Sequence, residues 1–230
     1  MKRTNRVMAF DADDTLWSNE PFFREVESEF TVLLGKYGTT EQISEWLFKT
    51  EMDNMKSLGY GAKAFTISML ETALRISNRM VSGDVLARII DLGKSLLEIP
   101  VEPMNGVVET LKLLKEKEGY DMIVVTKGDR TDQMNKFNRS GLSRYFDRID
   151  VLSDKKETDY LHLLEELQAV PDNFIMIGNS FKSDIAPVLA IGGSAVHIPS
   201  DITWLHENME TFEHPKLKCI GCFEELVTLF

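Results

Sequence analysis

Two aspartates, Asp11 and Asp13, stand two residues apart directly after the apolar run 7–10. An apolar run of this kind predicts a buried strand, so both carboxylates are expected where that strand ends. One carboxylate can serve as a nucleophile and its neighbour as an acid and base. A nucleophilic carboxylate suits phosphoryl transfer or dehalogenation. The second aspartate favours phosphoryl transfer, because an alkoxide leaving group needs a proton and a halide does not.

Three later apolar runs are also followed by polar residues. A threonine hydroxyl follows the first run, a pair of lysines follows the second, and an asparagine and an aspartate follow the third. The runs and the residues behind them are 122–125 with Thr126, Lys127 and Gly128, 149–152 with Lys155 and Lys156, and 174–177 with Asn179 and Asp184. Each run predicts a strand, and ligands of parallel sheets bind at the carboxyl ends of the strands. We therefore expect these residues and the two aspartates to lie at one edge of a sheet.

The four motifs together resemble those of the haloacid dehalogenase (HAD) superfamily, in its phosphatase branch with a small helical (C1-type) cap. The resemblance covers essentially the whole chain, and it is specific because four spaced motifs coincide with four predicted strand ends. It implies that Asp11 attacks phosphorus to form an aspartyl phosphate and also binds a metal ion. It implies that Asp13 protonates the leaving group, then deprotonates the hydrolytic water, and offers its backbone carbonyl to the metal. Asp14, where many relatives have glycine, is expected to shape the turn without reacting.

The resemblance also assigns the groups that would bind the phosphate. The hydroxyl of Thr126 and the backbone N–H groups of Lys127 and Gly128 are expected to hold the phosphoryl oxygens. Lys155 is expected to neutralise the nucleophile and the phosphate, because its spacing to a tyrosine on the next helix fits the superfamily better than that of Lys156. The choice between these two lysines stays open.

Charge counting predicts a metal ion at the same place. Asp11, Asp13 and Asp184 bring up to three negative charges beside a phosphate dianion. Two unit charges about 4 Å apart repel by about 4 kcal/mol even at an effective dielectric constant near 20, and one lysine does not offset this. The resemblance implies that this metal is Mg²⁺, which prefers oxygen ligands, and that it binds at Asp11, Asp13, Asn179 and Asp184. Relatives commonly carry aspartate in place of Asn179, so which of Asn179 and Asp184 contacts the metal directly is left open.

The order of predicted elements indicates an α/β protein with two parts. After about residue 107 helices and strands alternate, which predicts a Rossmann-like parallel sheet with helices on both faces. The resemblance implies five strands in the order 5-4-1-2-3. Between about residues 21 and 97 the apolar spacing is helical. We expect an α/β core of residues 1–15 and 100–230 with an inserted all-helical cap domain of residues 16–99, which in this superfamily admits small metabolites and shuts out macromolecules.

Composition narrows the class of protein. The 230 residues hold 26 Lys and Arg against 37 Asp and Glu, a formal net charge of −11, which argues against nucleic acid and anionic membranes as partners. The first apolar run is too short for a signal peptide or a membrane span, so we expect a cytoplasmic protein. Cys219 and Cys222 are expected to be reduced thiols.

The leading hypothesis is a Mg²⁺-dependent phosphatase that hydrolyses a small-molecule phosphomonoester through an aspartyl phosphate. The alternatives are a phosphomutase, a 2-haloacid dehalogenase of the same superfamily, and a non-catalytic binding protein on this fold. His197 is expected only to support its loop. The segment 58–65 is either a loop that selects substrate through Tyr60 or Lys63, or an ordinary interhelical turn. The sequence does not identify the substrate or the oligomeric state.

Overall fold

The computed structural model describes residues 6–117 and 119–230; residues 1–5, which begin the predicted core domain, lie outside the described part. Within that part, six parallel strands form one sheet in the order β3-β2-β1-β4-β5-β6. The strands are β1 (Arg6–Phe10), β2 (Tyr120–Lys127), β3 (Arg148–Leu152), β4 (Phe174–Gly178), β5 (Ser194–His197) and β6 (Leu217–Cys219). The predicted α/β class and the predicted order of five strands are confirmed. The predicted number was one too low, because β6 is only three residues long and too short to show a periodic pattern.

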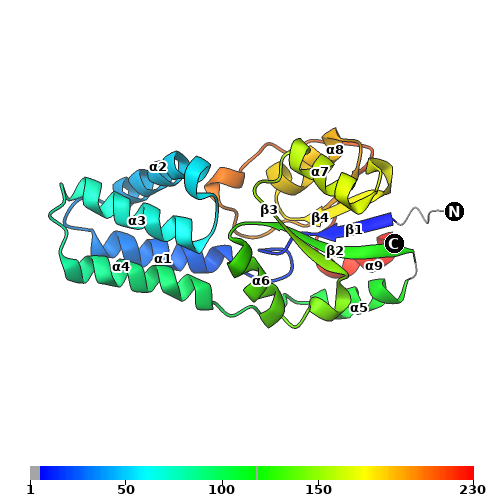
Figure 1. Ribbon diagram of the computed structural model, residues 1–230, viewed down its shortest axis with the longest axis horizontal. Helices are drawn as coiled ribbons and strands as arrows, with labels where there is room; N and C mark the ends of the chain where they lie inside the picture. The colour runs from blue at the N-terminus through cyan, green and yellow to red at the C-terminus, as the bar shows by residue number, and fades with distance from the viewer. Residues whose placement is uncertain (1–5, 118) are drawn as a thin grey trace. The chain divides into compact units, whose positions relative to one another are not determined.

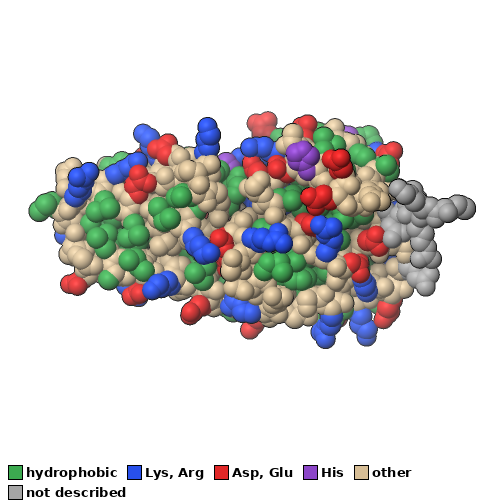
Figure 2. All heavy atoms as spheres, viewed as in Figure 1, with side chains coloured by type: hydrophobic (Ala, Val, Ile, Leu, Met, Phe, Trp, Pro, Cys, Tyr) green, Lys and Arg blue, Asp and Glu red, His purple; other side chains and the backbone are tan. Residues whose placement is uncertain are grey.

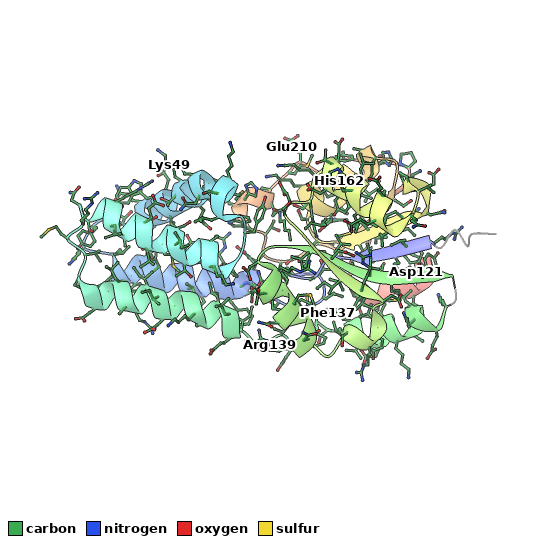
Figure 3. All side chains as sticks on the ribbon, viewed as in Figure 1. Lys49, Asp121, Phe137, Arg139, His162 and Glu210 are labelled. Carbon is green, nitrogen blue, oxygen red and sulfur yellow. The ribbon has the colours of Figure 1, made fainter. Side chains whose placement is uncertain are left out.

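Helices cover both faces of this sheet, and Figure 1 shows α5, α6 and α9 on one side and α7 and α8 on the other. Their bounds are α5 (Val107–Glu116), α6 (Arg130–Arg139), α7 (Glu157–Leu167), α8 (Ala186–Ala190) and α9 (Leu226–Leu229). Successive strand residues point to opposite faces, so β1 contributes Met8 and Phe10 to one apolar core and Val7 and Ala9 to the other. Phe137, labelled in Figure 3, packs from α6 against the first of these cores.

Strand β1 lies inside the sheet, between β2 and β4. Phe10 is level with Val124 on one neighbour and Ile177 on the other. The backbone N–H of Asp11 continues the ladder by donating to the carbonyl oxygen of Ile177 at 2.8 Å. The apolar run therefore ends in the middle of the sheet's carboxyl edge, where crossover connections leave room for a ligand.

Residues Pro21–Pro100 form a second compact unit, and the first comprises the residues up to Glu20 together with Val101–Phe230. The second unit contains helices and no strand over residues 21–100. Its helices are α1 (Glu20–Leu33), which begins one residue before the unit, α2 (Thr40–Leu58), α3 (Ala62–Ile76), α4 (Gly83–Ser95) and the short 3₁₀ helix η1 (Leu96–Glu98). They enclose their own apolar core, whose fully buried members include Phe30, Leu34, Ile43, Met69 and Ile89.

The surface of the helical unit carries apolar side chains, which Figure 2 shows gathered over α3 and α4 on the visible face. Exposed members on these helices include Ile67, Leu74 and Ile90. Among the described residues, no helix combines the length and the apolar character that crossing a membrane requires. The two cysteines at the end of β6 and just beyond it are exposed free thiols.

Candidate active site

A buried lysine joins two buried carboxylates at the carboxyl ends of β1, β3 and β4. Lys155 donates through Nζ to Asp184 Oδ1 at 2.7 Å and to Asp11 Oδ1. All three side chains are at most about a tenth exposed. Lys156 is 74% exposed and pairs with Asp154 at 2.8 Å instead. The structure therefore places Lys155, and not its neighbour, beside Asp11.

The charges of this cluster are not balanced. Burial, and then the neighbouring carboxylate of Asp184, raise the pKa of Asp11 to about 7, although Lys155 acts in the opposite direction. Burial alone would lower the pKa of Lys155, but the two carboxylates outweigh it and raise that pKa. Two carboxylates thus share one ammonium, and a further cation at this place would be stabilised by them.

Asp184 reaches the cluster because of the local backbone around it. A single π-helical turn, η4 (Phe181–Ile185), follows β4 and carries Asp184 back toward the strand end, where its Oδ2 accepts the N–H of Ser180 at 3.0 Å. A Cβ on Gly178 would lie 2.3 Å from that same oxygen. Only glycine at this position leaves room for the carboxylate.

Asn179 lies in the same cluster through its side chain. Thr15 Oγ1 is 3.0 Å from Asn179 Oδ1 and 3.4 Å from Asp11 Oδ2, so its single proton is shared between these acceptors. The backbone carbonyl oxygen of Asn179 lies 3.0 Å from Nε2 of His197. The tautomer of His197 that carries its proton on Nε2 donates a hydrogen bond to this oxygen. His197 thus fixes the backbone of Asn179, a contact that its position on β5, level with Gly178, makes possible.

The oxygen atoms gathered here fit a hard cation. The carboxylates of Asp11 and Asp184 and the amide oxygen of Asn179 are all oxygen donors, which suit Mg²⁺ rather than Zn²⁺. Among the described residues, no three His, Cys, Asp or Glu side chains lie close enough together to hold a metal ion by themselves. A metal at this place would therefore rely on amide and backbone oxygens in addition to the two carboxylates.

Asp13 is held apart from this cluster, on the side of α6. Its carboxylate accepts hydrogen bonds from Trp17 Nε1 at 2.8 Å, from Gln133 Nε2 at 2.7 Å and from Lys136 Nζ at 3.0 Å. The next residue, Asp14, has a backbone φ of 60°. Its carboxylate accepts the N–H groups of Asn19 and Glu20, so in the structure it shapes the turn into α1.

The predicted phosphate loop follows β2. Thr126 is buried at the strand end, and Gly128 has a φ of +135°, a conformation that residues with a Cβ rarely adopt. The side chain of Lys127 points to the side of β4, where its Nζ donates to Ser183 Oγ at 2.9 Å and to Glu207. This leaves the backbone N–H groups of the loop, and not the ammonium of Lys127, as candidates for binding phosphate.

Glu207 contacts residues around the site and was not predicted from the sequence. It ends the short helix η5 (Leu205–Glu207) in the connection from β5 to β6 and accepts hydrogen bonds from Lys127, Ser180 and Ser183. Burial alone would raise its pKa, but Lys127 and the two serine hydroxyls outweigh this and lower the pKa to about 2. The carboxylate thus joins the loops that follow β2 and β4.

Comparisons with known proteins identify the family of the chain. A family model described as haloacid dehalogenase-like hydrolase matches residues 6–192. The chain belongs to this family. It is therefore a hydrolase, as predicted. A curated relative, the glyceraldehyde 3-phosphate phosphatase of Methanothermobacter thermautotrophicus, is 24% identical over 209 residues that cover 86% of this chain and 87% of the relative.

Two solved HAD structures show the same fold. A haloacid dehalogenase-like family hydrolase from Xanthomonas campestris has a TM-score of 0.88 and 33% identity, covering 99% of this chain and 91% of the other. A HAD hydrolase from Bacillus subtilis, solved bound to magnesium, has a TM-score of 0.66 and 18% identity, covering 98% of each chain. Both support the α/β fold of the HAD family described above.

Proposed function

We propose that the protein is a Mg²⁺-dependent phosphatase that hydrolyses a small phosphomonoester through an aspartyl phosphate on Asp11. The observation that carries the proposal is the buried cluster at the end of β1, in which Asp11 is paired with Lys155 while a second carboxylate, Asp13, is held by its own donors two residues away. A nucleophile and a separate acid and base are what hydrolysis of an alkyl phosphate requires. A dehalogenase would not need the second group.

We assign a residue to each step of the proposed reaction. One carboxylate oxygen of Asp11 attacks phosphorus, and Lys155 offsets the negative charge of nucleophile and phosphate. Thr126 Oγ1 and the backbone N–H groups of Lys127 and Gly128 bind the phosphoryl oxygens. Asp13 enters the reaction protonated, gives its proton to the departing alkoxide and becomes a carboxylate, and then takes a proton from the water that attacks the aspartyl phosphate, which restores its protonated form.

The metal proposed for this site is Mg²⁺. Asp11, Asp184, the side-chain oxygen of Asn179 and the backbone carbonyl of Asp13 would hold it. When bound, it would neutralise charge on the phosphoryl oxygens during transfer. The raised pKa of Asp11 and the magnesium bound to the Bacillus subtilis relative support this proposal.

We further propose that the helical unit Pro21–Pro100 is the cap domain that selects small substrates. Because the curated relative is named for glyceraldehyde 3-phosphate, three-carbon sugar phosphates are the first substrates to test. Within that unit, the segment 58–65 is the proposed substrate-selecting loop; it carries Tyr60 between α2 and α3 and Lys63 in the first turn of α3.

The test is a screen of phosphomonoesters, including glyceraldehyde 3-phosphate, with release of inorganic phosphate as the readout. The proposal expects release that depends on Mg²⁺ and stops on addition of EDTA. Halide release from 2-haloacids without metal would favour the dehalogenase alternative. Transfer of the phosphoryl group between sugar hydroxyls, with no free phosphate, would favour the phosphomutase. No reaction of any kind would favour a binding protein.

A further inference from the structure

The carboxylate of Asp13 is held by side chains from two segments of the chain. Trp17 donates to its Oδ1, and Gln133 and Lys136 reach it from the first and second turns of α6. Lys136 Nζ lies 3.0 Å from one carboxylate oxygen and 3.1 Å from the other. Both oxygens of Asp13 therefore have donors, and the carboxylate has one defined orientation.

Lys136 is a buried ammonium, since its side chain is only 3% exposed. Besides Asp13, its Nζ donates to Asn19 Oδ1 at 2.8 Å and lies 3.8 Å from a carboxylate oxygen of Asp132. A buried charge is stable only when it is paired and hydrogen-bonded, so these partners fix where the ammonium can lie. The arrangement ties the segment that carries Asp13 and Asn19 to α6.

The side-chain amide of Gln133 donates to Asp13, and this orientation leaves its own oxygen without a hydrogen bond. Its Nε2 donates to Asp13 Oδ2 at 2.7 Å and to the carbonyl oxygen of Lys127 at 3.2 Å. Its Oε1 is buried and has no hydrogen-bond partner in the described part of the chain. A reversed amide would place Oε1 against two acceptor oxygens, so the observed orientation keeps the donor on Asp13 and leaves an acceptor unpaired, which is unfavourable in a protein interior.

We propose that Lys136 and Gln133 are positioning residues for Asp13 in the phosphatase reaction. This inference rests on the proposed function, because it matters only if Asp13 is the acid and base. A group that transfers a proton must lie within hydrogen-bond reach of the leaving-group oxygen, and a carboxylate on a turn needs other side chains to hold it there. Lys136 and Gln133 do this from α6, and Lys127 links the same glutamine to the predicted phosphate loop.

The inference is tested with Lys136→Met, which keeps the length of the side chain and removes the ammonium. The readout is kcat and KM for a series of phosphate esters whose leaving groups run from nitrophenol to simple alcohols. General acid catalysis contributes on the order of 10²–10⁴-fold, so we expect kcat/KM for alkyl phosphates, which reports formation of the aspartyl phosphate, to fall by roughly 10- to 100-fold. The kcat/KM of nitrophenyl phosphate, whose leaving group needs no proton, is expected to fall much less.

Matched controls separate positioning from a general structural effect. Lys112→Met removes an exposed lysine from α5 and is expected to leave all rates unchanged. Asp13→Asn combined with Lys136→Met is expected to be no worse than Asp13→Asn alone, because both changes remove the same function. Gln133→Met is expected to change the leaving-group dependence in the same direction, and it serves as the test if Lys136→Met does not fold.

Two results would overturn the inference. One is an equal loss of kcat/KM for nitrophenyl and alkyl phosphates in a folded variant. The other is a full additional loss from Lys136→Met on top of Asp13→Asn. A parent protein that hydrolyses no phosphate ester would instead refute the proposed function, and the inference with it.

Discussion

The buried carboxylate of Glu207 is expected to stabilise the folded protein by an amount that follows from its lowered pKa. In Glu207→Gln the carboxylate that joins Lys127, Ser180 and Ser183 becomes a neutral amide. The pKa of Glu207 is about 2 against an ordinary value of 4.5. A difference of about 2.5 pKa units corresponds to about 3 kcal/mol. Because the pKa is lower in the folded protein, this stability is fully present above pH 4.5 and is lost as the pH falls toward 2.

The assay is urea denaturation of parent and variant at pH 7 and at pH 3.5. We expect Glu207→Gln to reduce the free energy of unfolding by about 3 kcal/mol at pH 7 and by about 2 kcal/mol at pH 3.5. Glu210→Gln is the matched control on the same loop, since Glu210 is exposed (Figure 3). Equal destabilisation by the two variants, or a difference from the parent that does not change with pH, would refute the role given to Glu207.

Three further predictions concern the cluster at the end of β1. Lys155→Met is expected to lower kcat on the order of 10²–10³-fold, while Lys156→Met leaves it nearly unchanged, and the reverse ranking in steady-state assays would show that the wrong lysine was chosen. Asn179→Asp adds a negative charge where the metal is proposed to bind, so the half-saturating Mg²⁺ concentration should fall by roughly tenfold; an unchanged value would place Asn179 out of the metal's reach. Gly178→Ala should displace Asp184 and lower both activity and melting temperature, because its Cβ would lie 2.3 Å from the carboxylate; a variant as active and stable as the parent would contradict that packing.

The parts of the site that could be predicted from the sequence are those that follow from strand order. Asp11, Lys155 and Asp184 each come soon after an apolar run, and in a parallel sheet the ends of such runs meet at one edge. The apolar run before Asp11 is buried on both sides, as expected of a strand inside the sheet. The helical insert was visible for a similar reason, because its apolar spacing extends over several turns.

The parts that could not be predicted depend on contacts between distant residues that no local pattern marks. Glu207 lies 80 positions from Lys127, and Lys136 lies 123 positions from Asp13. A glutamate in a loop and a lysine on a polar helix are usually solvated, so their burial follows only from the folded chain. One signal was available for α6, where Gln133, Lys136 and Phe137 share one helical face, so that the buried stripe is partly polar.

The most direct test of the central claim is to trap the phosphorylated enzyme. Parent, Asp13→Asn and Asp11→Asn proteins are mixed with substrate and Mg²⁺, quenched in acid during turnover, and digested for mass spectrometry. The proposed mechanism predicts a hydroxylamine-sensitive phosphoryl group on Asp11, more abundant in Asp13→Asn because its hydrolysis is slowed, and no adduct or activity in folded Asp11→Asn. Turnover by Asp11→Asn within a few-fold of the parent, or a phosphoryl group on another residue, would contradict it.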